Sequence, residues 1–250
     1  MSLWPVWLII VALAVIGMII ASLAVVAGAG RTDRGPVIVR LTLWCATIVT
    51  VFTLLGAITN TAVALLNDQT AITLTVEPFW PTLPAGAHIE GPTAHLEDGG
   101  LTSGEVLLSG LSASTKICWA IGQGLAWLLP ATLAFLVSVM CRKLLAGQAF
   151  SPVVSRLTLI AAFVIAIGGI AMAILADTAS SLAAQQLLEY TGAEVPETGG
   201  KIDWLGDMWP QAGGGIGIPL WPIGAGLGLA ALSVAFRYGT RLEHETEGLI

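Results

Sequence analysis

The sequence predicts an all-α polytopic membrane protein with five transmembrane helices and a small β-rich extracytoplasmic cap. Composition supports this class, because 56% of the 250 residues are hydrophobic and only 10% are charged. A soluble domain carries about 25% charged residues, so this chain lacks the polar surface that water requires. The apolar residues also gather into long runs, and a helix needs about 20 such residues to cross a bilayer core.

The predicted spans cover most of the chain. They run over residues 4–29, 36–66, 116–140, 152–176 and 218–236. The first resembles a secretory signal, since Ala27 and Ala29 form an A-x-A pattern, but it lacks a basic n-region and is too long. We therefore expect a retained span. Residues 67–115 are expected to form the cap, residues 177–217 a second outer segment, and the end of 218–250 a cytoplasmic tail.

Charge placement predicts the orientation of these spans. With five spans, all ten basic residues except Lys116 and Lys201 lie on one side of the membrane. Most of the sixteen acidic residues lie on the other side. The positive-inside rule then places the N-terminus outside and the C-terminus in the cytoplasm of a plasma membrane.

The second span carries small and polar residues on one helical face, and this stripe admits two interpretations. Thr50, Thr53 and Asn60 recur at helical spacing among alanines and a glycine, which favours close helix packing with interhelical hydrogen bonds. The alternative is a permeation path that these residues line together with Gln123 of the third span. We favour packing, because such small-residue patterns are common in membrane helices.

Small-residue pairs also occur in the later spans. Gly224 and Gly228 form a GxxxG pattern in the last span, and Gly169 with Ala173 forms a similar pair in the fourth. Such pairs let helix backbones approach closely. They are compatible with packing within the chain, with a homo-oligomer or with a larger membrane complex.

Ionisable residues avoid the middle of every predicted span. Ion-coupled transporters and proton pumps usually need such groups within the membrane. Their positions therefore count against secondary active transport. They do not exclude the hypothesis of a passive pore.

The cap begins with a predicted strand in which Ile72, Leu74 and Val76 alternate with threonines. Short strands over residues 88–90 and 94–97 are also plausible. Another is predicted over 106–109, after a turn at Asp98-Gly99-Gly100.

Two His-x-Glu pairs in the cap are the candidate metal ligands, His88 with Glu90 and His95 with Glu97. On a strand, residues i and i+2 share a face, so each pair offers an imidazole and a carboxylate to one cation. The spacing matches no established metal motif, and solvated residues of an acidic cap explain it equally well.

We expect no cofactor, no direct nucleic-acid binding and no enzymatic activity. The chain has no G-x-S-x-G or H-E-x-x-H motif, and its glycine-rich run at 224–228 lies within a span rather than a βαβ unit. Its net charge of −6 argues against contact with phosphate backbones.

The loop between the third and fourth spans contains residues that are typical of helix ends. Gly147 is suited to a left-handed C-cap, Ser151 to an N-cap, and Pro152 to the first helical turn. Phe150 stands between these signals.

The tail after the last span contains Arg237, Arg241 and Glu245, with the last two spaced four apart. Its acidic residues are within reach of Arg142, Lys143 or Arg156, which would make a structural clasp. A solvated helix end in the headgroup layer is equally compatible with the sequence.

These two segments carry a family resemblance. The G-x-x-F-S-P loop and the terminal F-R-x-G-x-x-L-x-x-x-x-E-G-L resemble small bacterial membrane proteins of the domain of unknown function 2975. The resemblance implies a bacterial plasma membrane. Members are often encoded beside a helix-turn-helix regulator, which implies a cytoplasmic regulator as partner. The family usually has four spans, so the first span predicted here is an addition.

Taken together, these features favour a non-enzymatic integral membrane interaction protein, in the role of a sensory, regulatory or accessory subunit. The alternative is a passive channel or small-molecule transporter lined by the polar stripe. A metal-dependent site in the cap is the third interpretation, and it requires the two His-x-Glu pairs to converge.

Overall fold

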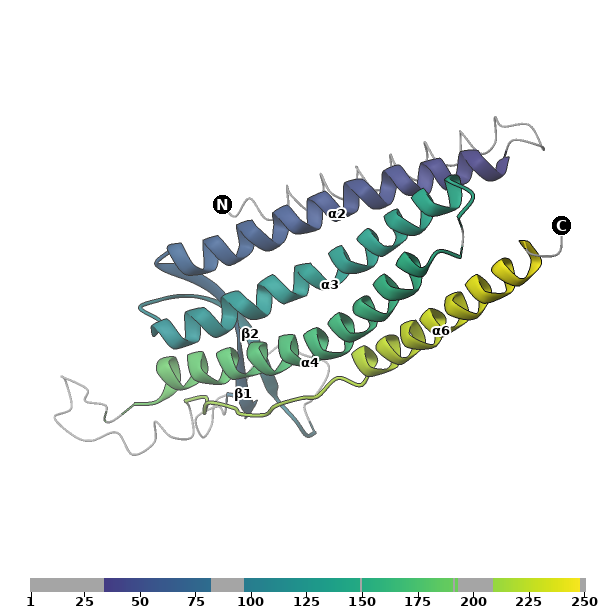
Figure 1. Ribbon diagram of the computed structural model, residues 1–250. Helices are drawn as coiled ribbons and strands as arrows, with labels where there is room; N and C mark the ends of the chain where they lie inside the picture. The colour runs from purple at the N-terminus through teal and green to yellow at the C-terminus, as the bar shows by residue number, and fades with distance from the viewer. Residues whose placement is uncertain (1–33, 82–96, 149, 191, 193–208, 248–250) are drawn as a thin grey trace. The chain divides into compact units, whose positions relative to one another are not determined.

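The computed structural model describes residues 34–81, 97–148, 150–190, 192 and 209–247. These residues form a mostly helical structure with one two-stranded sheet (Figure 1). The helices are α2 (Arg34–Leu66), α3 (Ala113–Leu145), α4 (Pro152–Leu188) and α6 (Trp221–Glu247). The strands are β1 (Gln69–Phe79) and β2 (Leu101–Ser109).

Three described helices are long and apolar enough to cross a membrane: α2 from Pro36 onward, α3 and α4. They confirm the second, third and fourth predicted spans. The first predicted span, residues 4–29, lies outside the described residues. α6 begins at Trp221 rather than at residue 218, and Arg237 ends its apolar part. That part is shorter than the roughly 20 residues of a bilayer core, so the described residues support three spans rather than five.

α4 continues well past the predicted end of its span, to Leu188. This stretch belongs to residues 177–217, which the sequence assigns to the second outer segment. Ala179, Ala183 and Ala184 are good helix formers in the extension, and all three are fully buried. At its end, the indole N–H of Trp209 donates to Leu188 O at 2.9 Å, which satisfies one terminal carbonyl.

The chain divides into two compact units, and α2, α3 and α4 contribute residues to both. Unit 1 contains residues 34–56, 127–168 and 220–247, as far as these are described. Unit 2 contains the described residues of the ranges 57–126 and 169–219.

In unit 1, small residues bring the helices close together. A methyl group on Gly56 of α2 would lie 2.7 Å from the Trp127 ring of α3. A methyl group on Gly226 of α6 would lie 2.8 Å from Ala166 Cβ and 2.9 Å from Ala162 O, both on α4. Gly226 therefore accepts no larger side chain without a shift of a helix, and Gly56 accepts none unless the Trp127 ring moves.

In unit 2, the antiparallel sheet packs on the extension of α4. The pairing runs from Gln69 opposite Ser109 to Thr75 opposite Ser103, with an irregularity before Phe79. The predicted alternation is confirmed, because Ile72 and Leu74 are buried. They share a hydrophobic core with four residues of α4: Ala179, Ala183, Ala184 and Leu188.

A segment that precedes α6 lies along the other edge of β1. Glu77 N donates to Gln211 O at 3.1 Å, and Gly213 N donates to Thr75 O at 3.0 Å. A methyl group on Gly213 would lie 2.5 Å from the carbonyl carbon of Val76, so the close approach requires glycine. β1 therefore has a partner on both sides, which removes one exposed strand edge.

Candidate interaction site

The most completely built candidate site lies in unit 1, where the loop after α3 meets the end of α6. The Phe150 ring packs directly on Gly239, where any side chain would collide with it. The ring centroids of Phe150 and Phe236 lie 6.4 Å apart. The Thr240 hydroxyl donates to Phe150 O at 2.7 Å. We call these four residues the clasp.

The end of α3 positions this loop through its predicted C-cap. Gly147 has a φ of +71°, in the left-handed region that favours glycine. Gln148 N donates to Lys143 O at 2.9 Å, and Gly147 N donates to Leu144 O at 3.1 Å. This pair of bonds is a Schellman motif. It ends the helix and turns the chain toward Phe150.

The start of α4 differs from the prediction in one respect. Pro152 is the first residue of the helix, as expected, and Ser151 O accepts from Val154 N at 3.0 Å. The Ser151 hydroxyl, however, is buried and has no hydrogen-bond partner among the described residues. The predicted side-chain cap is therefore wrong. Pro152 has no N–H to donate, and the N–H groups of Val154 and Ser155 already bond to the Ser151 carbonyl.

One helical turn into α4, two serines tie this helix to α6. Ser155 Oγ donates to Ser233 O at 3.0 Å, and Ser233 Oγ donates to Ser155 O at 2.8 Å. Both side chains are buried. No local sequence signal indicates this contact, because the two serines are 78 positions apart.

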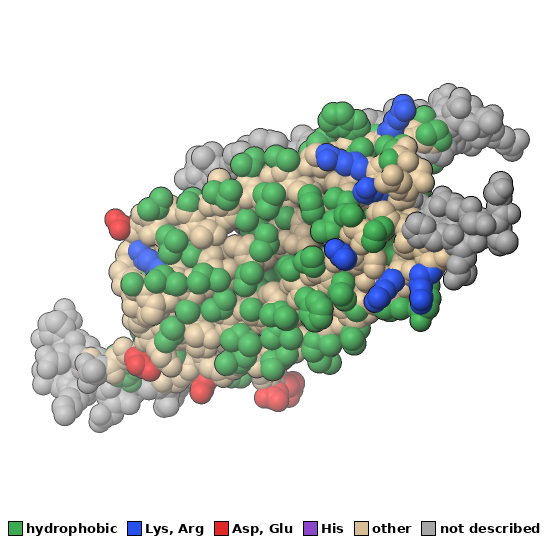
Figure 2. Space-filling model, in the orientation of Figure 1, with side chains coloured by type: hydrophobic (Ala, Val, Ile, Leu, Met, Phe, Trp, Pro, Cys, Tyr) green, Lys and Arg blue, Asp and Glu red, His purple; other side chains and the backbone are tan. Residues whose placement is uncertain are grey.

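Four exposed arginines lie on the helices that lead into the clasp. They lie in the last turn of α3, the first turns of α4 and the end of α6: Arg142, Arg156, Arg237 and Arg241. None of them has a hydrogen bond or ion pair with another described side chain. Figure 2 shows lysine and arginine side chains gathered on unit 1. Lys143 is different, since its ammonium group donates to Gln148 Oε1 at 3.0 Å.

The expected ion pairs between the acidic tail and Arg142, Lys143 or Arg156 stay a prediction. Glu245 lies in α6, but its side chain is outside the described part of the structure. The contacts that do join loop and tail are aromatic packing and a hydroxyl–carbonyl hydrogen bond. The spacing of these residues in the sequence does not indicate which residues of the loop and the tail meet.

The polar stripe of α2 is divided between the units. In unit 1, Thr50 and Thr53 are buried, and each hydroxyl donates to the carbonyl four residues earlier at 2.7 Å. In unit 2, Asn60 and Gln123 are half-buried. Because the two threonine protons are held by their own helix, these hydroxyls resemble packing residues more than the lining of an aqueous path.

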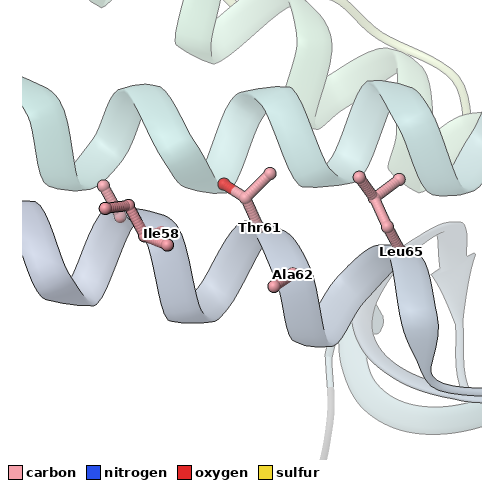
Figure 3. A pocket seen from close by; sticks show the side chains of 5 residues that line it. Ile58, Thr61, Ala62 and Leu65 are labelled. Carbon is pink, nitrogen blue, oxygen red and sulfur yellow. The ribbon is translucent and has the colours of Figure 1, made fainter.

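An open groove in unit 2 runs along the second half of α2 (Figure 3). Its volume is about 490 Å³, and its surface is almost wholly apolar. The lining residues are Ala57, Ile58, Thr61, Ala62 and Leu65. The four residues of the predicted permeation path are not among them. This groove therefore gives the channel interpretation no support.

The GxxxG pair of the last span does not make the packing contact of α6. A methyl group on Gly224 or Gly228 would have no described atom within 4 Å. Gly226, between them, approaches α4 instead. Residues two apart on a helix are separated by about 200°, so the pair lies on a different face from the contact.

The candidate metal ligands of the cap cannot be placed together. His88, Glu90 and His95 lie outside the described residues, and Glu97 is exposed. Among the residues that are described, there is no group of three or more His, Cys, Asp or Glu side chains able to hold a metal ion. The His-x-Glu site stays a prediction.

Unit 2 contains a polar contact that the sequence analysis missed. Gln186 of α4 accepts from Ser112 N at 2.8 Å through its side-chain oxygen. Its side-chain nitrogen donates to Ser112 Oγ at 3.0 Å and to Thr115 Oγ1 at 2.7 Å. Gln186 thereby fixes the N-terminus of α3, where Ser112 precedes the first helical residue.

None of the family models, curated proteins or solved structures compared with the chain matches it. The resemblance to the domain of unknown function 2975 therefore stays a prediction. The two segments that carry the resemblance are also the two that meet in the clasp.

Proposed function

We propose that the chain is a non-enzymatic integral membrane protein that binds a protein partner at the clasp, as a regulatory or accessory subunit. One observation carries the proposal: the clasp joins segments 90 positions apart, yet leaves large side chains exposed around it. Phe150 is 42% exposed and Tyr238 is 63% exposed. Exposed aromatic residues beside arginines are typical of binding hot spots.

The same proposal includes five spans, with the N-terminus outside and the C-terminus in the cytoplasm. Its support is the charge of each unit taken separately. The basic side chains described in unit 1 are Arg40, Arg142, Lys143, Arg156, Arg237 and Arg241, whereas Lys116 is the basic side chain described in unit 2. Under the positive-inside rule, the clasp then faces the cytoplasm. α6 would cross the membrane together with the exposed apolar residues that precede it, Ile218 and Leu220.

The test is purification from the native membrane without overexpression, followed by mass spectrometry of what remains bound. We expect stoichiometric recovery with another protein. Tyr238→Ala should weaken binding of that partner about 30-fold, because aromatic anchors often contribute 2 kcal/mol or more to binding. Leu227→Ala, a similarly exposed position in the apolar part of α6, is the control and should recover the partner normally.

Two outcomes would contradict the proposal. Recovery of the chain alone, or only with copies of itself, would remove the obligate partner. Equal loss of partner in the Tyr238 and Leu227 variants would mean that the partner binds elsewhere.

A further inference from the structure

The arginines on the helices that lead into the clasp are positioned for a second class of ligand. We propose that Arg156 and Arg237, supported by Arg142 and Arg241, bind the phosphate groups of anionic lipids. The inference goes beyond the proposed function, because it requires no protein partner.

The first argument is the depth of these residues along their helices. Arg142 directly follows the apolar part of α3, Arg156 lies one turn after the start of α4, and Arg237 ends the apolar part of α6. Each arginine thus stands where a helix would leave the hydrocarbon. Lipid phosphates lie at that level, and arginine side chains reach them while their stems stay in apolar surroundings.

The second argument is the register of α4 against α6 within unit 1. The two helices lie side by side in Figure 1 and run antiparallel. Ser155 contacts Ser233, and Phe150 contacts Gly239, so a step toward the start of α4 matches a step toward the end of α6. Arg237 therefore lies level with the first turn of α4.

The third argument is chemical. Arg156 belongs to that same region of α4, whose N-terminal end carries a partial positive charge from the helix dipole. Its guanidinium and that of Arg237 are exposed and unpaired with described side chains. A guanidinium matches a phosphate through two parallel N–H···O bonds. An acidic peptide offers carboxylates to the same fork, but it approaches from water rather than at the level of the headgroups.

The test uses the full chain in nanodiscs of phosphatidylcholine, or of phosphatidylcholine mixed with phosphatidylglycerol. After transfer to mild detergent, native mass spectrometry counts the lipids that each molecule retains. We expect selective retention of phosphatidylglycerol. The double variant Arg156→Gln/Arg237→Gln should weaken that retention about 25-fold, since each basic residue near an anionic surface contributes about fivefold.

Arg40→Gln removes one charge from α2, so it is the control for each single variant, Arg156→Gln and Arg237→Gln. It should leave the retention within about twofold of the unchanged chain. Equal retention of the two lipids would overturn the proposal, and so would an equal loss in the control. Displacement of phosphatidylglycerol by an acidic peptide at equal concentration would also overturn it, in favour of a protein ligand.

If the double variant does not fold, the unchanged chain decides the question. High salt screens charge, so about 0.5 M salt should abolish selectivity for phosphatidylglycerol. Selectivity that persists there would overturn the proposal. These measurements use the purified chain alone, so failure of the proposed protein partner would leave them unchanged.

Discussion

In unit 1, helices meet where a small residue accepts a large or close neighbour, as Gly56 accepts Trp127 and Gly239 accepts Phe150. In unit 2, the same α4 instead carries a sheet with a hydrophobic core of its own. Side chains bond to distant backbone in both units, as Ser155 does to Ser233 O and Trp209 does to Leu188 O. The charges differ too, since unit 1 displays arginines and unit 2 displays the described acidic side chains.

The two surroundings of a membrane protein, lipid and water, account for the different packing in the two units. Between lipid-embedded helices, apolar side chains gain little by leaving lipid, so close packing and interhelical hydrogen bonds provide the stability. A water-facing segment gains free energy by burying apolar surface, which is what the alternating side chains of β1 do. The comparison therefore agrees with the predicted placement of the sheet outside the hydrocarbon.

The largest expected effect is on the core of unit 2. Ile72 is 1% exposed, and Ile72→Ala should lower the free energy of local unfolding by about 2–5 kcal/mol, because it leaves a cavity. Hydrogen exchange of the β1 amides measures this change. Leu107→Ala, on β2 and 63% exposed, should cost less than about 0.5 kcal/mol. Equal losses would show that the core does not hold the sheet.

Gln186 provides the next test of unit 2. Gln186→Ala removes three hydrogen bonds and leaves the fully buried Thr115 hydroxyl without its partner on α4. We expect a loss of about 1–3 kcal/mol, seen as faster hydrogen exchange in the first turns of α3. Gln185→Ala is the neighbouring control, since Gln185 is exposed. Equal hydrogen exchange in the Gln186→Ala and Gln185→Ala variants would refute the role of this contact.

In unit 1, two glycine substitutions should change the free energy of unfolding in opposite directions. Gly226→Ala forces α6 away from Ala162 and Ala166, at a net cost of about 1–2 kcal/mol. Gly228→Ala meets no described atom within 4 Å and should gain up to about 1 kcal/mol of helix propensity. Unfolding in mixed micelles measures both. Destabilisation by Gly228→Ala would reveal a further partner on that face.

The smallest expected effect concerns the serine pair. Ser233→Ala removes the bond from Ser233 Oγ to Ser155 O, while Ser155 Oγ can still donate to the Ser233 carbonyl. The loss should cost about 0.6–1.7 kcal/mol, the range for hydrogen bonds between membrane helices. The double variant Ser155→Ala/Ser233→Ala removes both bonds and should cost about twice as much on unfolding in mixed micelles. Ser138→Ala is the control, because that hydroxyl donates only within its own helix. Unchanged stability of the double variant would leave Gly226 as the main attachment of α6.

Local sequence signals were sufficient for several elements. Long apolar runs predicted α2, α3 and α4, because a helix is the structure that satisfies backbone groups within lipid. Alternation of apolar residues and threonines predicted β1, and Gly147 predicted the end of α3. Each signal depends on neighbours within one or two turns of the chain, which the sequence displays directly.

The sequence by itself determined three helices long and apolar enough to cross a membrane, the first strand and the uneven distribution of charge. Only the tertiary structure decided that Phe150 meets Gly239, that Ser155 meets Ser233, and that Gly226 makes the contact of α6. It also showed that the Ser151 hydroxyl does not cap α4. These outcomes depend on which faces two distant helices turn toward each other. A periodic pattern in one helix identifies faces that are able to pack, but the register between helices selects the face that does.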